Sequence, residues 1–256
     1  MSTDNHPILR PTRRALLMTG AAATAASALG TWRNPSAMAR NLKAPTFGST
    51  VYDNALKAEG GIKGVFQSPY YNATVVSGKH LNHLVLLQLK NWLNSFQFAY
   101  KMPAEDLHTI VATYASANIL TYGDAIWEKY KLGEKYEITD PATGNPATRN
   151  LFWEARFGPD APKDITAKDN YYQDTGIQVL QERGAVLLSC NNSMGGHAAA
   201  AVSDGRAPAG MEAADVAAEI AANLVPNATL VPAVVGEVSR AQAAGYSLVF
   251  IPNFPL

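Results

Sequence analysis

The chain has 256 residues, of which 47% are hydrophobic and 16% charged, and its 21 basic residues balance its 21 acidic ones. This balance gives no electrostatic support for binding nucleic acid or anionic lipid, because both require clustered positive charge. Beyond the N-terminal segment, no apolar run approaches the roughly 20 residues that a membrane-spanning helix needs. We therefore expect a mature chain without a membrane span and without a nucleic-acid partner.

The first 39 residues have the pattern of an export signal. Arg13 and Arg14 precede an Ala-rich, weakly apolar stretch, and Ala37-Met38-Ala39 has the small-residue pattern of a cleavage site. Adjacent arginines before a weakly hydrophobic segment favour a twin-arginine signal peptide. The alternative is an amphipathic N-terminal helix, but the segment has no charged face. We expect cleavage after Ala39 and a soluble periplasmic protein that begins at Arg40.

The mature chain of about 217 residues fits one domain. Removing residues 1–39 takes away four Arg and one Asp, which leaves 17 basic and 20 acidic residues and a net charge of −3. Cys190 is its only cysteine. In an oxidising compartment a single cysteine cannot form an internal disulfide, so it is buried and inert, reactive, or paired with a partner.

The first half of the mature chain reads as an extension followed by alternating strands and helices. Residues 40–60 are polar, with a short helix expected over 51–58. Apolar and β-branched runs predict strands at 62–67 and 107–114, and a broad apolar face predicts a helix over 80–102. A second helix is expected over 119–130. Residues 133–170 are rich in Pro, Gly, Asp and Asn, and we interpret them as an insertion into the domain of residues 61–256.

The second half continues the alternation. We expect helices over 171–183, 212–224 and 232–244, and strands over 184–190, 228–231 and 246–251. Residues 194–210 are dense in Gly, Ala and Ser and read as a second insertion. Five strands that alternate with helices predict a three-layer α/β/α fold with a mostly parallel five-stranded sheet.

Cys190 lies at the carboxyl end of the most apolar predicted strand. Ligands and reactive groups in open parallel sheets lie just beyond the carboxyl ends of the strands, so we take Cys190 as the centre of any chemistry. The thiolate is the reactive form of cysteine, and amides at the start of a following helix favour that anion. The alternative is that Cys190 is a small apolar residue packed at a strand end.

Two segments resemble proteins of the DsrE/DsrF-like family. The first is Gly184-Ala-Val-Leu-Leu-Ser-Cys190-Asn-Asn-Ser193, and the second is the run Val-Pro-Ala-Val-Val-Gly-Glu-Val-Ser-Arg-Ala-Gln-Ala-Ala-Gly-Tyr over residues 231–246. The resemblance implies an α/β/α fold with a five-stranded parallel sheet, trimeric or hexameric assembly, and sulfur trafficking. In that family the cysteine carries sulfane sulfur as a persulfide between a donor and an acceptor. Export and the two insertions depart from the family pattern.

Other residues are candidates for lining or supporting the site around Cys190. Asn191, Asn192 and Ser193 follow it directly and offer hydrogen-bond donors. His197 and His80 are expected on the same rim, where a histidine could deprotonate the thiol or protonate a leaving sulfur. Two further candidates, Ser116 and Asn118, follow the strand at 107–114, although helix capping explains them equally well. A reactive thiol at this rim is expected to be partly exposed.

Two functions follow from these residues. The first is a periplasmic carrier that binds or transfers sulfane sulfur through Cys190, with a possible sulfurtransferase-like activity and no further cofactor. The second is an oligomeric binding module for a metal, haem or small ligand, in which Cys190 is a ligand or a filler. His80 and His83 are candidate metal ligands together with Cys190 and His197, but they lack the closed ligand sets of known zinc sites, and we predict no metal site.

The export signal can be tested directly. Replacing Arg13 and Arg14 together by Lys should leave the protein uncleaved in the cytoplasm, because the twin-arginine route depends on both guanidinium groups. Fractionation and N-terminal sequencing measure this result. Normal processing of the double variant to a chain beginning at Arg40 would remove the twin-arginine assignment.

Overall fold

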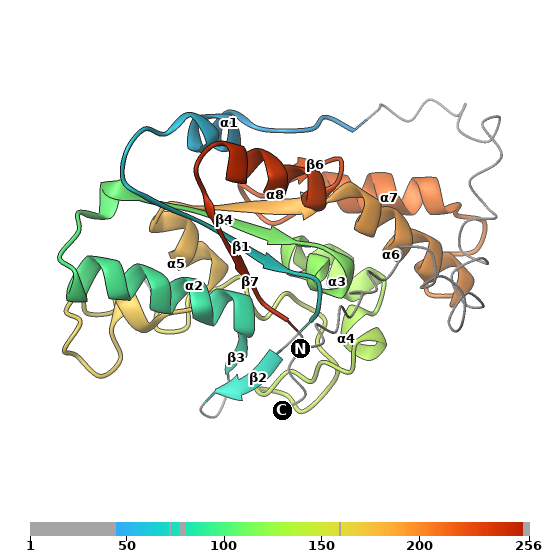
Figure 1. Cartoon of the computed structure of the whole chain (residues 1–256). Coiled ribbons are helices and arrows are strands. Elements are labelled where there is room, and N and C mark those ends of the chain that lie inside the picture. The colour runs from blue at the N-terminus through green and yellow to red at the C-terminus, as the bar shows by residue number, and fades with distance from the viewer. Residues whose placement is uncertain (1–44, 72, 77–79, 159, 253–256) are drawn as a thin grey trace, which may run out of the picture. The chain divides into compact units, whose positions relative to one another are not determined.

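The chain folds around a five-stranded parallel sheet in a computed structural model that describes residues 45–71, 73–76, 80–158 and 160–252 (Figure 1). The strand order is β6-β5-β4-β1-β7, and all four neighbouring pairs are parallel. The strands are β1 (Ile62–Ser68), β4 (Leu107–Thr113), β5 (Ala185–Cys190), β6 (Thr229–Val231) and β7 (Ser247–Phe250). The predicted fold class is confirmed. The export segment and the start at Arg40 lie outside the described residues.

Helices cover both faces of the sheet because successive strand residues point to opposite sides. One face packs against α1 (Thr50–Lys57) and α8 (Val234–Ala243), and the side chains of Val186, Leu188 and Cys190 lie on this face. The other face is covered by α2 (Leu84–Asn94), α3 (Asp124–Lys129), α5 (Ile177–Glu182), α6 (Asn191–Ser203) and α7 (Ala213–Ala222). None of the helices in the described part of the chain has the length and apolar character needed to cross a bilayer.

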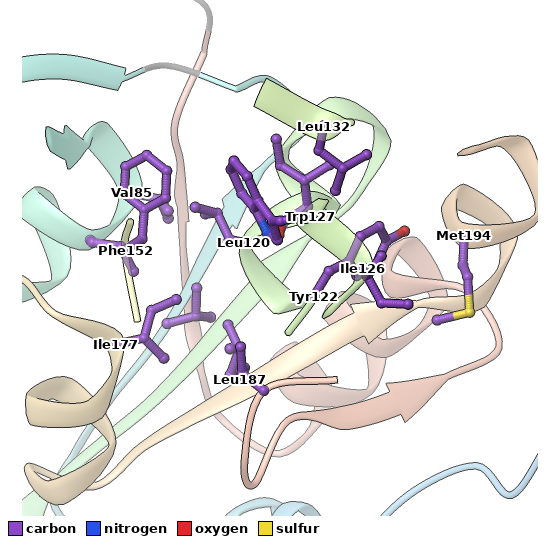
Figure 2. Close-up of a cluster of buried hydrophobic side chains, with 14 of the residues drawn as sticks. Val85, Leu120, Tyr122, Ile126, Trp127, Leu132, Phe152, Ile177, Leu187 and Met194 are labelled. Carbon is purple, nitrogen blue, oxygen red and sulfur yellow. The ribbon is translucent and has the colours of Figure 1, made fainter. Parts of the chain in front are cut away.

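The second face carries the larger hydrophobic core. Trp127 is its largest fully buried side chain, and the indole nitrogen donates a hydrogen bond to the Ile119 carbonyl at 3.3 Å. Figure 2 shows side chains from β5, α3, α5, α6 and the connecting loops gathered in this cluster. The 3-10 helix η4 (Ala115–Thr121) supplies two of its fully buried members, Ile119 and Leu120. The carboxyl ends of the strands are thus backed by a packed core.

The helix predicted over 80–102 is shorter than expected at both ends. Residues His80–His83 form β3, which pairs antiparallel with β2 (Ala73–Val76) in a separate two-stranded ribbon. The buried His83 ring ends that strand and caps α2, because its Nδ1 accepts a hydrogen bond from the Val85 amide at 3.2 Å. After Asn94 the helix widens into a π-helical turn, η2 (Ser95–Ala99). His80 therefore does not begin the helix.

Two other predicted helices are interrupted. Residues 119–130 divide between η4 and α3, and 171–183 between the 3-10 turn η5 (Tyr171–Gln173) and α5. The second break follows from Asp174, whose buried carboxylate accepts hydrogen bonds from the Gly176 and Phe157 amides. Two smaller helical elements, η3 (Ala104–Asp106) and α4 (Leu132–Lys135), complete the described helices.

The segment 133–170 has little regular structure, as its composition indicated, but it is held tightly to the core. The side-chain amide of buried Asn150 donates hydrogen bonds to the carbonyls of Leu120 and Tyr122 at 2.9 and 2.8 Å. Its main-chain amide donates to the Asp124 carboxylate. Gly133 lies so close to the main chain of Ala147 that a Cβ there would meet its N and O at 2.3 Å. The segment therefore packs as an ordered part of the domain.

Gly133→Ala tests this close approach. The added methyl group must push the Ala147 main chain away, so the free energy of unfolding should fall by about 1–3 kcal/mol, with a loss of several degrees in Tm. Gly236→Ala is the matched control, since a Cβ at this exposed position in α8 meets nothing within 4 Å. The control should be neutral or slightly stabilising. Equal melting temperatures for the two variants would contradict the packing described.

Candidate functional site

Cys190 is the last residue of β5 and the N-cap of α6, so the strand passes into the helix without a loop. Within residues 194–210, which we interpret as a second insertion, the part up to Ser203 is helical and belongs to α6. Gly195 and Gly196 weaken helix propensity, but burial of Met194, Ala198 and Ala201 on one face against the core stabilises α6. The first-turn amides of a 13-residue helix therefore begin directly after the thiol.

The Cys190 side chain lies on the α1/α8 face of the sheet and is nearly enclosed. The residue retains 4% exposure, in a cluster with Val231, Val234 and the partly buried Tyr114. Register explains these neighbours, because Cys190 pairs with Val231 of β6, and Tyr114 follows the pair Thr113–Ser189 on β4. The expectation of a partly exposed thiol is wrong, because the strand ends inside the packed layer. Cys190 is a free cysteine.

Asn118 fixes the main chain of Cys190. Its Oδ1 accepts a hydrogen bond from the Cys190 amide at 2.8 Å, and its Nδ2 donates to the Cys190 carbonyl at 3.1 Å. The same Nδ2 donates to the Tyr122 hydroxyl at 3.0 Å. Asn118 is completely buried, so these bonds form away from competing water. The sequence suggested that Asn118 lines a pocket, whereas in the structure it positions the strand end.

His197 joins the same hydrogen-bond network from α6. Its Nδ1 lies 2.8 Å from the Tyr122 hydroxyl oxygen. Because Tyr122 accepts from Asn118, its own proton is free to donate to Nδ1, which requires an unprotonated Nδ1. Burial lowers the pKa of His197 to about 4, with nearby Arg206 acting in the same direction and a main-chain hydrogen bond at Ala115 opposing it. His197 is therefore neutral near pH 7.

The network reaches Cys190 through its backbone, not through the sulfur. His197 contacts Tyr122 and Tyr136 on the face opposite the thiol, with ring centroids 5.7 and 6.0 Å apart. Met194 and Ala198, its neighbours on α6, pack into the core of that opposite face. His197 thus supports the position of the strand end and does not reach the thiol as a direct base.

Ser193 and Ser116 hold the loops around the site. Ser193 Oγ accepts a hydrogen bond from the Ala115 amide at 2.8 Å, which stabilises the left-handed conformation of Ala115 at φ 47°. Ser116 Oγ accepts from the Tyr71 amide at 2.8 Å and donates to the Pro69 carbonyl at 3.5 Å. Both serines therefore tie the segments that follow β1 and β4 to the carboxyl edge of the sheet, where the sequence predicted them.

Asn191 and Asn192 occupy the first turn of α6. The Asn192 amide donates to the Pro232 carbonyl at 3.3 Å, which links α6 to the segment that leads into α8. Asn192 is exposed and Asn191 partly buried. Their side-chain amides make no hydrogen bond with other described residues, so both remain available at the edge.

The histidines weighed as metal ligands do not gather at Cys190. His80 is the first residue of β3, where it pairs with Val76 of β2. His83 is fully buried, and its ring packs against Tyr71 and Phe152 with centroids 5.7 and 6.0 Å away. Within the described ranges, no three His, Cys, Asp or Glu side chains form a group that could hold a metal ion.

Sequence reasoning missed two tyrosines at the site. Tyr122 is fully buried and connects Asn118 to His197. Tyr114 extends β4 by one residue beside Cys190, and burial raises its pKa, with smaller contributions from Tyr70 and Cys190. The register of two adjacent parallel strands was the available signal for Tyr114, because residues at equal register share a face. Tyr122 gave no such signal, since it lies in the loop between η4 and α3.

Searches of protein-family models, curated proteins and solved structures found no match to this chain.

Buried His83 and partly buried His197 predict a loss of stability in acid. Burial lowers the pKa of His83 to about 3 and that of His197 to about 4, whereas both titrate near 6.5 in the unfolded chain. Below pH 6.5 the unfolded chain binds protons that the folded chain does not. Each histidine should then reduce the free energy of unfolding by up to about 1.4 kcal/mol per pH unit.

Denaturant unfolding of the wild type and His197→Gln at pH 7, 6 and 5 measures this effect. Gln keeps a hydrogen-bond acceptor for Tyr122 but does not titrate, so the variant should lose less stability between pH 6.5 and 5. Carboxylates titrate alike in both proteins, which makes the difference specific to His197. Parallel stability curves would contradict a His197 that stays neutral in the folded protein.

Proposed function

We propose that the protein carries sulfane sulfur as a persulfide on Cys190, as the resemblance to DsrE/DsrF-like proteins implies. The carrier would be exported, and it would receive sulfur from a donor and pass it to an acceptor thiol in the periplasm. The observation that supports this proposal best is the position of Cys190 between the carboxyl end of β5 and the first turn of α6.

Sulfur transfer needs the anionic forms of the thiol and of the persulfide. Both the thiolate and the persulfide anion carry a negative charge next to the positive end of the helix dipole. The α8 helix also begins nearby, since Val234 of its first turn belongs to the cluster around Cys190. The two hydrogen bonds from Asn118 hold the Cys190 main chain in place, so the sulfur keeps one position relative to the two helix N-termini.

The proposed transfer is balanced without an added oxidant. The Cys190 thiolate attacks the outer sulfur of a donor persulfide, forming one S–S bond while the donor S–S bond breaks. The donor leaves as a thiolate and is protonated by water, and Cys190 then holds the terminal sulfur. An acceptor thiolate attacks that sulfur in the second step and restores the Cys190 thiolate.

Tyr114 controls how a donor reaches the sulfur in this proposal. It flanks Cys190 on β4 and is partly buried, while Tyr70 beyond it is 46% exposed. Since Cys190 itself is nearly enclosed, a donor must approach past the Tyr114 ring or displace it. The phenol is also a hydrogen-bond donor for a persulfide anion, because its raised pKa keeps it protonated at neutral pH.

The burial of Cys190 favours the alternative function. A thiol with 4% exposure in an apolar cluster is typical of a structural filler, and the protein would then be an oligomeric binding module for a metal, haem or other small ligand. The two functions differ in the chemistry of the native thiol, which a single set of variants can distinguish.

Incubating the native protein with polysulfide should add the mass of one or more sulfur atoms, reversibly with dithiothreitol. Intact-protein mass spectrometry measures the adduct, and Cys190→Ser should abolish it while the fold is retained. Tyr114→Ala should accelerate alkylation of native Cys190 by iodoacetamide, because it opens the approach. Tyr114→Phe is the matched control, since it keeps the ring and should alkylate like the wild type.

No sulfur adduct on native Cys190, together with no alkylation even in Tyr114→Ala, would overturn the carrier proposal. A bound metal or visible absorption band in protein purified from its own periplasm, lost in Cys190→Ser, would support the binding module instead. An adduct that persists in Cys190→Ser would show that the sulfur is held noncovalently.

A further inference from the structure

The two edge strands of the sheet differ in whether another segment of the chain covers them. At the β6 edge, the segment before α1 lies alongside the strand, where the Gly48 amide donates to the Leu230 carbonyl at 2.9 Å and the Ser49 and Thr229 hydroxyls lie 2.6 Å apart. The opposite edge is β7, which pairs with β1 on one side (Figure 1). On its other side, the described part of the chain supplies no strand.

The open edge strand β7 is apolar, whereas edge strands normally carry residues that prevent pairing with another chain. Its sequence is Ser247-Leu-Val-Phe250, without a charged residue or a proline. Leu248 is 42% exposed and Phe250 48% exposed. Both lie on the α1/α8 face, since Leu248 pairs with buried Val65, but α1 and α8 leave nearly half of each residue exposed. Edge strands usually carry charges, prolines or bulges that prevent pairing with another chain, and β7 has none of these within its bounds.

The other face beside this edge carries an aromatic ladder, which we define as Trp92, Phe96 and Tyr100. The ring centroids of Trp92 and Phe96 are 4.6 Å apart, and those of Phe96 and Tyr100 are 5.5 Å apart. The ladder begins at β1, because Trp92 packs edge-on against Phe66 at 5.9 Å and a Cβ on Gly64 would meet its ring. Ser247 and Val249 of β7 pair with these same two residues. Tyr100, at the outer end, is 69% exposed.

The helical segment that bears the ladder also has an unusual surface. Between Leu84 and Tyr100 the one charged residue is Lys90, which is buried and donates to the Gln173 side chain at 2.9 Å. The exposed positions of this segment are Gln88, Asn91, Ser95, Ala99 and Tyr100. Depletion of charge together with enrichment in aromatic residues is typical of the core of a protein interface.

We propose that β7 and the aromatic ladder form an interface with a second copy of this chain, related by a two-fold axis. A two-fold axis makes the β7 strands of the two copies run antiparallel. The two sheets then join into a single sheet of ten strands, in which the β7 edge of each copy is paired with the β7 edge of the other. Leu248 and Phe250 of each copy become covered on one face, and the two aromatic ladders approach each other on the other face.

A second copy fits this surface better than a different partner would. The strand β7 and the exposed positions of residues 84–100 carry no charge with which to select an oppositely charged partner, and for the same reason these positions do not repel a second copy. An antiparallel strand pair is self-complementary, as a two-fold interface requires. The four residues of β7 extend only about 13 Å. Strand pairing alone therefore buries less surface than the about 800 Å² per copy that a stable dimer needs. The aromatic ladder provides the additional contact area.

Light scattering of the purified protein tests the interface. The wild type should have at least the mass of a dimer at micromolar concentration, and Leu248→Lys with Phe250→Lys should reduce it to the monomer or halve a larger assembly. Tyr100→Lys alone should weaken association by about tenfold or more, as loss of an interface aromatic does. All three side chains are exposed, so circular dichroism should show an unchanged fold.

Val235→Lys is the matched control, since Val235 is 56% exposed on α8 and lies outside the proposed interface. It should leave the mass unchanged. In a Cys190→Ser background, Leu248→Cys should be linked between copies by a short bismaleimide, and Val235→Cys should not. A monomeric wild type, or an unchanged mass in the β7 double variant, would overturn the proposal. Neither result depends on sulfur transfer at Cys190.

Discussion

The side-chain amide of Asn118 holds together the carboxyl edge of the sheet. It binds both main-chain groups of Cys190 and the Tyr122 hydroxyl, and it therefore fixes β5 relative to η4. Tyr122 extends the network to His197, which places α6 relative to the same loop. A buried network in which each polar group has a partner specifies one arrangement, because any alternative leaves a donor or acceptor unsatisfied in a low-dielectric interior. The strand end, the 3-10 helix and the following helix consequently behave as one unit.

The positions of the site residues could be predicted from the sequence, but the contacts that join them into this unit could not. Each strand of the sheet was predicted close to its observed bounds, because apolar and β-branched runs between turn residues are a local signal. Cys190, Ser116, Asn118 and Ser193 all lie at the predicted edge for the same reason. Their roles depend on contacts between residues more than 40 positions apart, such as Asn118 with Cys190, and no local pattern encodes those contacts.

The wrong expectations have equally physical causes. The Gly-rich and Ala-rich composition of residues 194–203 gave no signal for a helix, which forms because three side chains of α6 are buried against the core. Residues 80–83 suit a helix or a strand by hydrophobicity, and pairing with β2 selects the strand. The burial of Cys190 was missed because exposure depends on the α1/α8 layer, which comes from both ends of the domain. Periodicity in one element cannot report how deeply another element covers it.

The direct junction between β5 and α6 limits how this region can change in evolution. Each residue added to a helix turns everything after it by about 100°. With no loop between Cys190 and Asn191 to absorb an insertion or a deletion, one residue gained or lost there would rotate Ser193 and His197 away from Ala115 and Tyr122 together. Substitutions can accumulate at this junction, but its length is fixed. Variation in chain length is instead expected in the irregular segment 133–170, whose turns can lengthen without moving the sheet.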